Sequence, residues 1–265
     1  MLYFVATPIG NLKDVSYRAI ETLNLVDEIA CEDTRHSLVF LNHYNIKKPL
    51  ISYHKFNEVS ASEKIIEKLK SGLNIAVISD AGTPIISDPG NQLVKMLIEQ
   101  ELEFTVIPGA CALISAFVLS GIDGGKFCFL GFLPQKQKDR KELLEQFVNI
   151  PLPLIFYCAP HDVVKDIKSI YEILGDRRAV VVKEITKLFE SVKRFDLKDG
   201  LTGEIKGEYV LIVDKPQKQE VNSLSEEEHI KRYLNKGVEK KQAIKLVAKE
   251  RGVSKSSLYK WTIDK

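Results

Sequence analysis

Short runs of apolar, often β-branched residues alternate along this chain with longer segments whose apolar residues recur at helical spacing. Such runs predict buried strands, and the segments between them predict helices that cover the strands. We expect strands at residues 2–6, 28–31, 50–53, 75–80, 104–107, 127–133, 154–158, 179–185 and 209–213. We expect helices at 60–70, 139–147 and 163–174, one after an N-cap at Ser16, and one that buries Leu93, Val94, Leu97 and Ile98. The short connections indicate an α/β fold.

Three expected strands in the first half end in loops of small residues, Gly and Pro. The loops read ATPIG at 6–10, SDAGTP at 79–84 and IPGACA at 107–112. Such loops let a ligand approach the backbone, and ligands of open α/β sheets bind at the carboxyl ends of the strands. Three of them at one edge of a sheet favour a binding site, with Asp80 at the centre. The first loop lacks GxGxxG, which argues against an NAD-type site.

Charged residues follow two other expected strands. Glu32, Asp33 and Arg35 lie in the sequence CEDTR, a pattern that fits an active-site edge but also a helix start capped by Asp33 or Thr34. Lys183 and Glu184 end a strand in the second half, where their charges face either a cleft or solvent. The residues alone leave both interpretations open.

Composition narrows the class of protein. The chain has 265 residues, 45% hydrophobic and 28% charged, which suits a globular protein of two domains or one large one. It has no apolar run of membrane-spanning length, and its start lacks the basic flank of a signal peptide, so we expect neither a membrane span nor a leader. Its four cysteines are widely separated, which predicts reduced thiols in a cytoplasmic protein and no zinc site.

The last part of the chain differs from the rest in charge. Residues 229–265 hold eleven Lys and Arg against three Asp and Glu, a net of +8, which leaves −6 on the first 228 residues. A basic tail on an acidic body favours contact with a polyanion. We expect the contacts from Lys245, Lys249, Lys255 and Lys260.

The same segment has a helical pattern. Residues 215–222 read as a linker, and Ser225 to Glu228 form a capping box. Amphipathic helices at 238–250 and 254–261 resemble a helix-turn-helix. The expected core is Ala243, Leu246, Val247, Ala248, Val253, Leu258, Tyr259 and Trp261. With a boundary before the Gly-rich stretch 120–126, the predicted domains are 1–115, 116–218 and 223–265.

Taken together, five motifs resemble the tetrapyrrole methylase superfamily. They are VATPIGNLKD, CEDTR, SDAGTPIISDPG, IPGACAL and KEITK, in this order along the chain. Within the superfamily they are most similar to the branch that 2'-O-methylates small-subunit ribosomal RNA, a resemblance that includes the basic tail. The tetrapyrrole branch usually carries a glycine-rich loop where this chain has ATPIG.

The resemblance implies two α/β domains with S-adenosylmethionine in the cleft between them, a homodimer and no metal. It also implies the residues that hold the cofactor, which are Pro8, Asp80, Ala81, Gly82, Thr83, Cys111, Ala112, Tyr157 and Val210. One position departs from the family, which commonly has Ser where this chain has Cys111. We therefore expect the contact there to use backbone groups.

The reaction implied is methylation of a cytidine ribose in 16S ribosomal RNA, free or in the 30S subunit. In-line methyl transfer from a sulfonium needs positioning, and a ribose hydroxyl benefits from a general base. The candidates are Glu32, Asp33, Lys183 and Glu184, with His54 as a further one and Arg35 holding a phosphate or a carboxylate. Two alternatives remain: a methylase of a small tetrapyrrole-like acceptor, and a non-catalytic regulator that binds nucleic acid.

Overall fold

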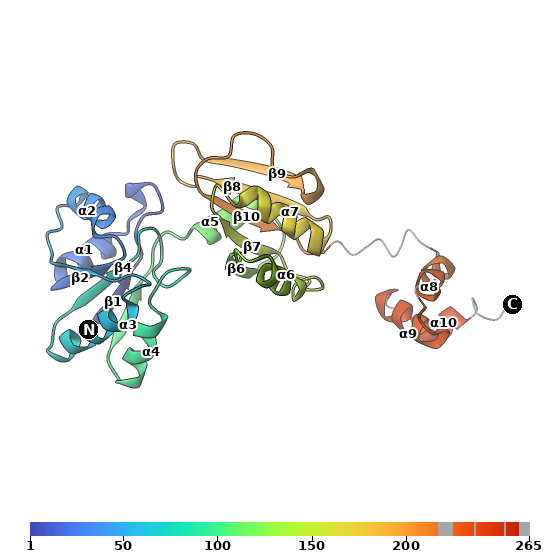
Figure 1. The fold of residues 1–265 in the computed structure, drawn as a ribbon, viewed down its shortest axis with the longest axis horizontal. Coiled ribbons are helices and arrows are strands. Elements are labelled where there is room, and N and C mark those ends of the chain that lie inside the picture. The colour runs from blue at the N-terminus through green and yellow to red at the C-terminus, as the bar shows by residue number, and fades with distance from the viewer. Residues whose placement is uncertain (217–224, 236, 252, 260–265) are drawn as a thin grey trace. The chain divides into compact units, whose positions relative to one another are not determined.

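The structure, a computed structural model, describes residues 1–216, 225–235, 237–251 and 253–259 (Figure 1). The chain divides into two compact units, Met1–Lys215 and Pro216–Lys265, which are described separately. The first unit contains two five-stranded sheets, and the second is helical. The fold is the α/β architecture that the alternating pattern predicts.

The first sheet is entirely parallel and has the order β3-β2-β4-β1-β5. Its strands are β1 (Leu2–Val5), β2 (Glu28–Cys31), β3 (Leu50–Ser52), β4 (Ile75–Ile78) and β5 (Phe104–Ile107). Strand β1 lies between β4 and β5, with Val5 opposite both Ile78 and Ile107. The loops ATPIG, SDAGTP and IPGACA therefore leave one edge of the sheet from three adjacent strands.

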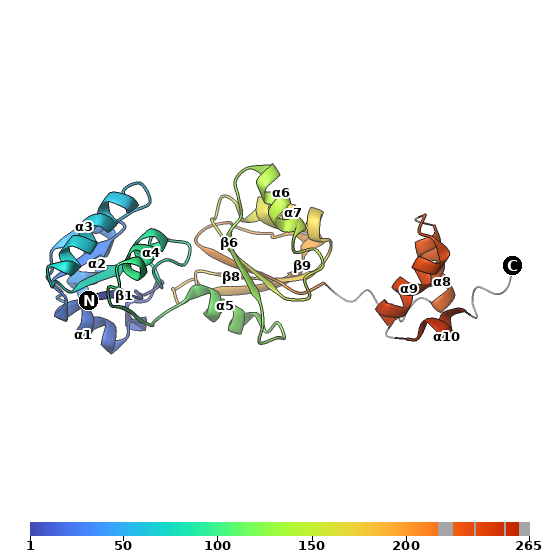
Figure 2. The same cartoon turned by 90° about the horizontal axis from the view of Figure 1, so that it is seen from below.

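Helices cover both faces of this sheet, as parallel sheets require. They are η1 (Leu12–Asp14), α1 (Tyr17–Leu25), α2 (Thr34–His43), α3 (Glu58–Lys70) and α4 (Asn91–Glu99). Helices α1 and α2 pack Leu23 and Leu41 against one face, while α3 and α4 pack Ile65 and Leu93 against the other. Figure 2 shows α1 and α3 on opposite sides of the sheet.

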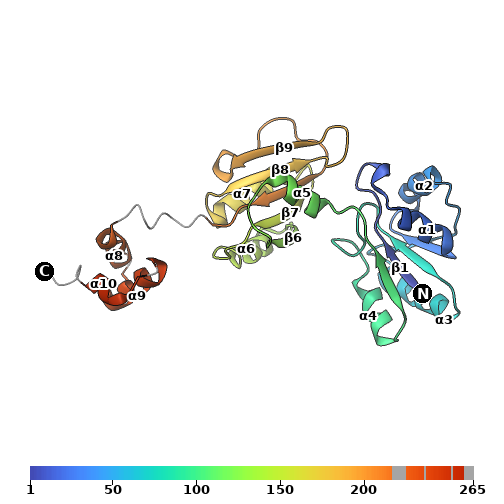
Figure 3. The ribbon, with the colours of Figure 1, turned by 180° about the vertical axis from the view of Figure 1, so that it is seen from behind.

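The second sheet is mixed and has the order β6-β7-β10-β8-β9. Its strands are β6 (Cys128–Phe132), β7 (Leu154–Cys158), β8 (Arg178–Lys183), β9 (Ser191–Asp196) and β10 (Tyr209–Val213). Only β6 and β7 are parallel. The associated helices are α5 (Ala112–Ser120), α6 (Gln137–Glu145), α7 (Val163–Leu174) and η2 (Leu197–Asp199). Helix α5 lies on one face, and α6 and α7 lie on the other (Figures 2 and 3).

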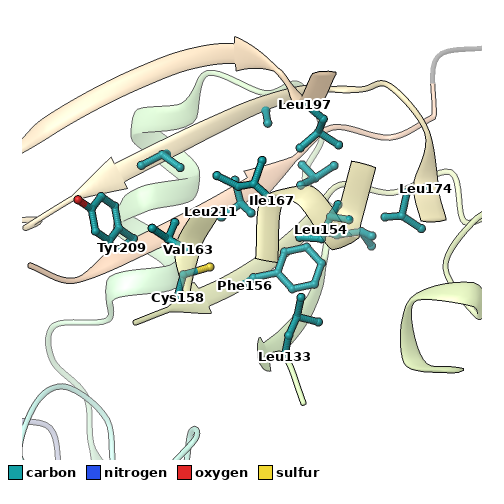
Figure 4. Close-up of a cluster of buried hydrophobic side chains, with 14 of the residues drawn as sticks. Leu133, Leu154, Phe156, Cys158, Val163, Ile167, Leu174, Leu197, Tyr209 and Leu211 are labelled. Carbon is teal, nitrogen blue, oxygen red and sulfur yellow. The ribbon is translucent and has the colours of Figure 1, made fainter. Parts of the chain in front are cut away.

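The face under α7 forms a closely packed core. Phe156 of β7 and Leu211 of β10 meet Ile167 of α7, and all three are almost fully buried (Figure 4). The opposite face packs against Leu113 and Ala116 of α5, so this helix, which follows β5, belongs with the second sheet. Helix α5 spans the boundary at residue 115 that the sequence predicts.

The second unit has its own small core. It contains α8 (Glu226–Leu234), α9 (Lys240–Arg251) and α10 (Lys255–Tyr259). The capping box between Ser225 and Glu228 is confirmed. The core residues are Ile230, Ile244, Val247, Ala248 and Leu258. The prediction that Val253 and Tyr259 belong to it is wrong, since they are 38% and 44% exposed, and Trp261 lies outside the described residues.

Two further sequence predictions in the first unit are corrected. Ile98 of α4 is 63% exposed, because the buried stripe of this short helix runs through Leu93 and Leu97. Strand β9 was not expected, because its sequence SVKRFD is polar, as suits the edge strand that it forms beside β8. No helix in the described part of the chain has the length and apolar character that a membrane span needs.

Candidate active site

A cavity of about 420 Å³ lies at the carboxyl ends of the first sheet's strands and is closed by the second sheet. The first half contributes residues that follow β1, β2, β4 and β5. They are Ile9, Glu32, Asp80, Ala81, Gly82, Thr83, Ile86, Ser87, Asp88, Cys111 and Ala112. The second half contributes Phe132, Tyr157, Cys158, Ala159, Pro160, Val182, Ile185, Glu208, Tyr209 and Val210. Its size and mixed lining are those of a small-molecule site.

The loops after β1 and β4 are tied together at the floor of the cavity. Thr7 and Gly82 exchange two backbone hydrogen bonds of 2.9 and 3.2 Å, and the Thr7 hydroxyl donates to the Ser79 carbonyl at 3.1 Å. Gly82 has a φ of +83°, and a Cβ there would lie 3.2 Å from Ile9. Glycine thus allows the close approach of the two loops, and the backbone is left accessible to a ligand.

Carboxylates dominate the polar part of the lining. Glu32, Asp80, Asp88 and Glu208 line the cavity, and no Lys, Arg or His is among the described residues that do so. Burial, with the charges of Glu32 and Asp80, raises the pKa of Asp88 from 3.8 to about 6. Burial and Asp80 also raise the pKa of Glu32. Ionised carboxylates that repel one another in a partly dry site favour a cationic ligand.

The segment CEDTR divides between the cavity and a helix start. Glu32 lines the cavity, whereas Asp33 is the N-cap of α2 and accepts the Arg35 backbone N–H at 2.9 Å. The guanidinium of Arg35 pairs with Asp33 at 2.9 Å, and its side chain is 89% exposed. Hydrogen bonds from Arg35 lower the pKa of Asp33 to about 2. Asp80 accepts the Asp33 backbone N–H at 3.3 Å, which ties this segment to the loop after β4.

Lys183 and Glu184 lie outside the cavity lining. Glu184 accepts the Glu208 backbone N–H at 2.8 Å and pairs with Lys187 at 3.0 Å. Although burial opposes the shift, these contacts lower the pKa of Glu184. The Lys187 side chain passes over Gly10 so closely that a Cβ there would clash with it, and Thr186 donates to Asp14. The residues after β8 thus join the second sheet to the loop after β1.

An aromatic group forms part of the second-sheet wall. The Tyr157 ring lies 4.9 Å from that of Phe129 and 5.6 Å from that of Phe132, centroid to centroid. Burial raises the pKa of Tyr157 to about 12, so its hydroxyl is neutral. Phe132 keeps 56% of its surface exposed, although it lines the cavity.

Most residues that the family resemblance implied for the cofactor lie together around this cavity. Asp80, Ala81, Gly82, Thr83, Cys111, Ala112, Tyr157 and Val210 all line it. Pro8 is not among the lining residues, but its neighbour Ile9 is. The sequence interpretation did not single out Asp88 or Phe132. The sequence does contain a signal for Asp88, which lies in the same Pro- and Gly-rich loop as Asp80. It contains no comparable signal for Phe132, whose position depends on how β6 pairs with β7.

The cysteines of this protein are free thiols, and two of them are buried. Cys31 and Cys158 are buried and Cys111 and Cys128 are half-buried, and all four are free. Burial raises the pKa of the Cys158 thiol, which keeps it protonated. Across the described residues, no group of three or more His, Cys, Asp and Glu side chains is arranged to hold a metal ion.

Two methyltransferases are among the solved structures that share this fold, at sequence identities so low that only the folds are compared. The methyltransferase CobJ superposes with a TM-score of 0.64 at 16% identity, covering 81% of this chain and 94% of that one. Uroporphyrin-III C-methyl transferase from Thermus thermophilus, in complex with S-adenyl homocysteine, superposes with a TM-score of 0.58 at 14% identity, covering 84% and 99%.

Sequence relatives are much closer. Ribosomal RNA small subunit methyltransferase I of Halalkalibacterium halodurans is 42% identical over 97% of this chain and 93% of its own length. The protein of the same name from Bacillus subtilis is 42% identical over 98% and 92%. The family model of the Tetrapyrrole (Corrin/Porphyrin) Methylases matches residues 1–199. This chain therefore belongs to the tetrapyrrole methylase family and, within it, to the ribosomal RNA small subunit methyltransferase I family.

Proposed function

We propose that this chain is an S-adenosylmethionine-dependent methyltransferase that methylates the 2'-hydroxyl of a cytidine ribose in 16S ribosomal RNA. The observation that carries the proposal is 42% identity, over nearly the whole chain, to proteins named ribosomal RNA small subunit methyltransferase I. The acidic cavity between the two sheets suits the cofactor, because S-adenosylmethionine carries a sulfonium and an ammonium against one carboxylate. Since ribosomal subunits are in the cytoplasm, we propose that the enzyme acts there.

The cofactor fits the strand ends of the first sheet. Asp80 to Thr83 present a carboxylate and small residues to the cavity, and Gly82 keeps the backbone accessible. Cys111 and Ala112 begin helix α5, and Cys111 makes no side-chain cap. The helix start thus offers backbone N–H groups, so a serine hydroxyl is not required at position 111. Tyr157 and Val210 form the facing wall, and Pro8 supports the loop through Ile9.

When bound, S-adenosylmethionine supplies a methyl group on a positively charged sulfur. The protein's task is to position the acceptor and to remove its proton. We assign the base to Glu32, the one residue of CEDTR, Lys183 and Glu184 that lines the cavity. Its raised pKa makes it a better base than an ordinary carboxylate. Asp33 and Glu184 have lowered pKa values and hold helix α2 and the loop after β8.

Glu32→Gln tests that assignment. The variant should bind S-adenosylhomocysteine with wild-type affinity and lose about 10²- to 10⁴-fold in kcat, the usual contribution of a general base. Calorimetry measures the first and transfer of a tritiated methyl group measures the second. Retention of kcat would move the base to another residue, and a loss of cofactor affinity would make Glu32 part of the cofactor site.

The second unit supplies the attraction for RNA. Lys245 and Lys255 are exposed on α9 and α10, away from the small core. The side chain of Lys249 and the whole of Lys260 lie outside the described residues. Cations on this segment would bind phosphates without reading sequence, while the cavity would select the nucleotide.

We also propose that the enzyme is a homodimer. Several large apolar side chains of the first unit are exposed, among them Val118 at 74%, Leu188 at 89% and Phe189 at 72%. Surface of this kind is characteristic of an interface when it is contiguous. Light scattering of the purified protein gives the mass directly, and a monomer at micromolar concentration would contradict this part of the proposal.

Mapping of ribosomal RNA modifications tests the function as a whole. RNA from cells that lack the gene should lose one 2'-O-methylcytidine in the small subunit, and the gene should restore it. Purified enzyme should methylate 30S subunits from those cells, and comparison with naked 16S RNA identifies the true substrate. An unchanged modification map, together with no thermal stabilisation by S-adenosylhomocysteine, would favour a non-catalytic regulator. Stabilisation with an unchanged map would favour a small acceptor.

A further inference from the structure

The outer edge of the cavity is polar at Ser87 and Glu208 and apolar at two other exposed residues, which lie on irregular backbone. Ile86 and Phe132 line the cavity and are 43% and 56% exposed. On the inner walls, Ile9 and Val210 are only 8% and 5% exposed. The exposure places Ile86 and Phe132 at the mouth, where a macromolecular acceptor must enter. We call these two residues the apolar lip.

A β-bulge directs Phe132 to this mouth. In the pairing of β6 with β7, Phe129 lies opposite Ile155, and Phe132 lies opposite Tyr157. Ile155 and Tyr157 are two residues apart and share one face of the sheet. Phe129 and Phe132 are three apart, so the extra residue turns Phe132 onto that same face. Without the bulge, Phe132 would point to the opposite face, towards the core under α7.

The other half of the lip is held by strained backbone. Ile85 and Ser87, on either side of Ile86, have φ angles of +77° and +70°. A β-branched residue in this region is rare, because its Cβ clashes with the backbone. Ser87 lies against the bulge, where a Cβ on Gly131 would be 3.3 Å from its hydroxyl oxygen. The strained loop and the bulge thus support each other and together present two exposed apolar side chains.

We infer that the apolar lip is the binding site for the base of the acceptor nucleotide, which stacks on Phe132 and packs against Ile86. The inference rests on the proposed function. A ribose can reach the cavity only if its nucleotide leaves the helical stack, and the freed base then needs a new apolar surface. Proteins provide that surface with aromatic rings, which accept a base by its face. Tyr157 covers one side of Phe132 and leaves the remainder of the ring open.

The experiment compares Phe132→Ala, Phe132→Tyr and Tyr171→Ala. Tyr171 is an aromatic residue on α7 that is 40% exposed and does not line the cavity, which makes it the matched control. The assay is transfer of a tritiated methyl group to 30S subunits from cells that lack the gene. Phe132→Ala should lower kcat/KM roughly 5- to 150-fold, the range expected for one lost stacking contact. Phe132→Tyr, which keeps the ring, should recover most of the kcat/KM that Phe132→Ala loses, and Tyr171→Ala should remain within about twofold of wild type.

Two further measurements keep the outcomes distinct. The affinity for S-adenosylhomocysteine should not change in Phe132→Ala, and Ile86→Ala should lower kcat/KM less than Phe132→Ala does. Wild-type kcat/KM in Phe132→Ala overturns the inference and leaves the proposed function intact. Loss of S-adenosylhomocysteine binding also overturns it, because Phe132 would then hold the cofactor. If the wild-type enzyme methylates neither 30S subunits nor 16S RNA, the proposed function fails and the inference fails with it.

Discussion

We predict that Asp88 makes the affinity for S-adenosylmethionine depend on pH. Its pKa is raised from 3.8 to about 6 by burial and by Glu32 and Asp80, so the free enzyme protonates it just below neutral pH. A bound sulfonium would stabilise the ionised form and return the pKa towards its ordinary value. By linkage, a full return to 3.8 makes the apparent affinity about tenfold weaker at pH 5 than at pH 7.5. The affinity should rise with pH through about 6.

The assay is calorimetric titration at several pH values between 5 and 7.5, on the wild type and on Asp88→Asn. The wild type should lose up to about tenfold in affinity for S-adenosylmethionine towards pH 5, and the variant should show a much flatter profile. S-adenosylhomocysteine, which has the same ammonium and carboxylate but a neutral sulfur, should respond less. A flat wild-type profile, or a variant that keeps the wild-type slope, would refute the electrostatic argument.

The same shift predicts an effect on stability. Because burial and the neighbouring carboxylates raise the pKa of Asp88, ionised Asp88 destabilises the folded state at neutral pH. A raised carboxyl pKa lowers stability as the pH rises from about 4 to 6. Asp88→Asn should therefore melt several degrees higher than the wild type at pH 7.5 and show little difference at pH 4.

Four other predictions follow from the two units. Asp80→Ala should abolish S-adenosylhomocysteine binding in calorimetry while circular dichroism stays native, and unchanged affinity would remove Asp80 from the site. Arg35→Ala should weaken RNA methylation and spare cofactor binding, and loss of both would assign Arg35 to the cofactor pocket or the fold. Deletion after residue 222 should keep cofactor affinity and flatten the salt dependence of 30S binding, whereas an unchanged slope would refute an RNA-binding role. Burial lowers the pKa of His229, so its contribution to stability is complete above about pH 6.5 and is lost as the pH falls through the folded-state pKa. Once hydrogen exchange is corrected for its intrinsic dependence on pH, the amides of α8 and α9 should be less protected at pH 5 than at pH 7.5, and His229→Gln should lack that loss of protection.

The sequence predicts the strands of this protein well because their apolar runs are short, buried and bounded by Gly, Pro or charge. Strand β9 escapes the pattern because an edge strand with one neighbour, β8, needs few apolar residues. The small residues after β4 also predict a ligand site, because they let a ligand approach the backbone at the end of a buried strand. The local sequence is therefore enough to predict the α/β fold and the loops that form the floor of the cavity.

The rest of the site depends on pairing between distant segments. Gly131 in CFLGF, with a φ of +62°, suits a bulge, but the local sequence does not set the register of β6 against β7, and without the bulge Phe132 belongs to the other face. The sequence CEDTR also does not say which of its two carboxylates enters the cavity. Asp33 is kept out of it because it is the N-cap of helix α2, and Glu32 lines the cavity instead. The charge state of Asp88 depends on Glu32, a residue 56 positions earlier, so it follows only from the assembled strand ends.

The place of β1 between β4 and β5 has a consequence for synthesis of the protein on the ribosome. Residues Leu2–Val5 are made first, yet they pair with Ile75–Ile78 on one side and Phe104–Ile107 on the other. At about 5–20 residues per second, this apolar segment waits roughly 5–20 s before both neighbours exist. During that time its two open edges are available to chaperones or to other nascent chains. The first sheet is therefore completed only after β1 has been exposed for a long time.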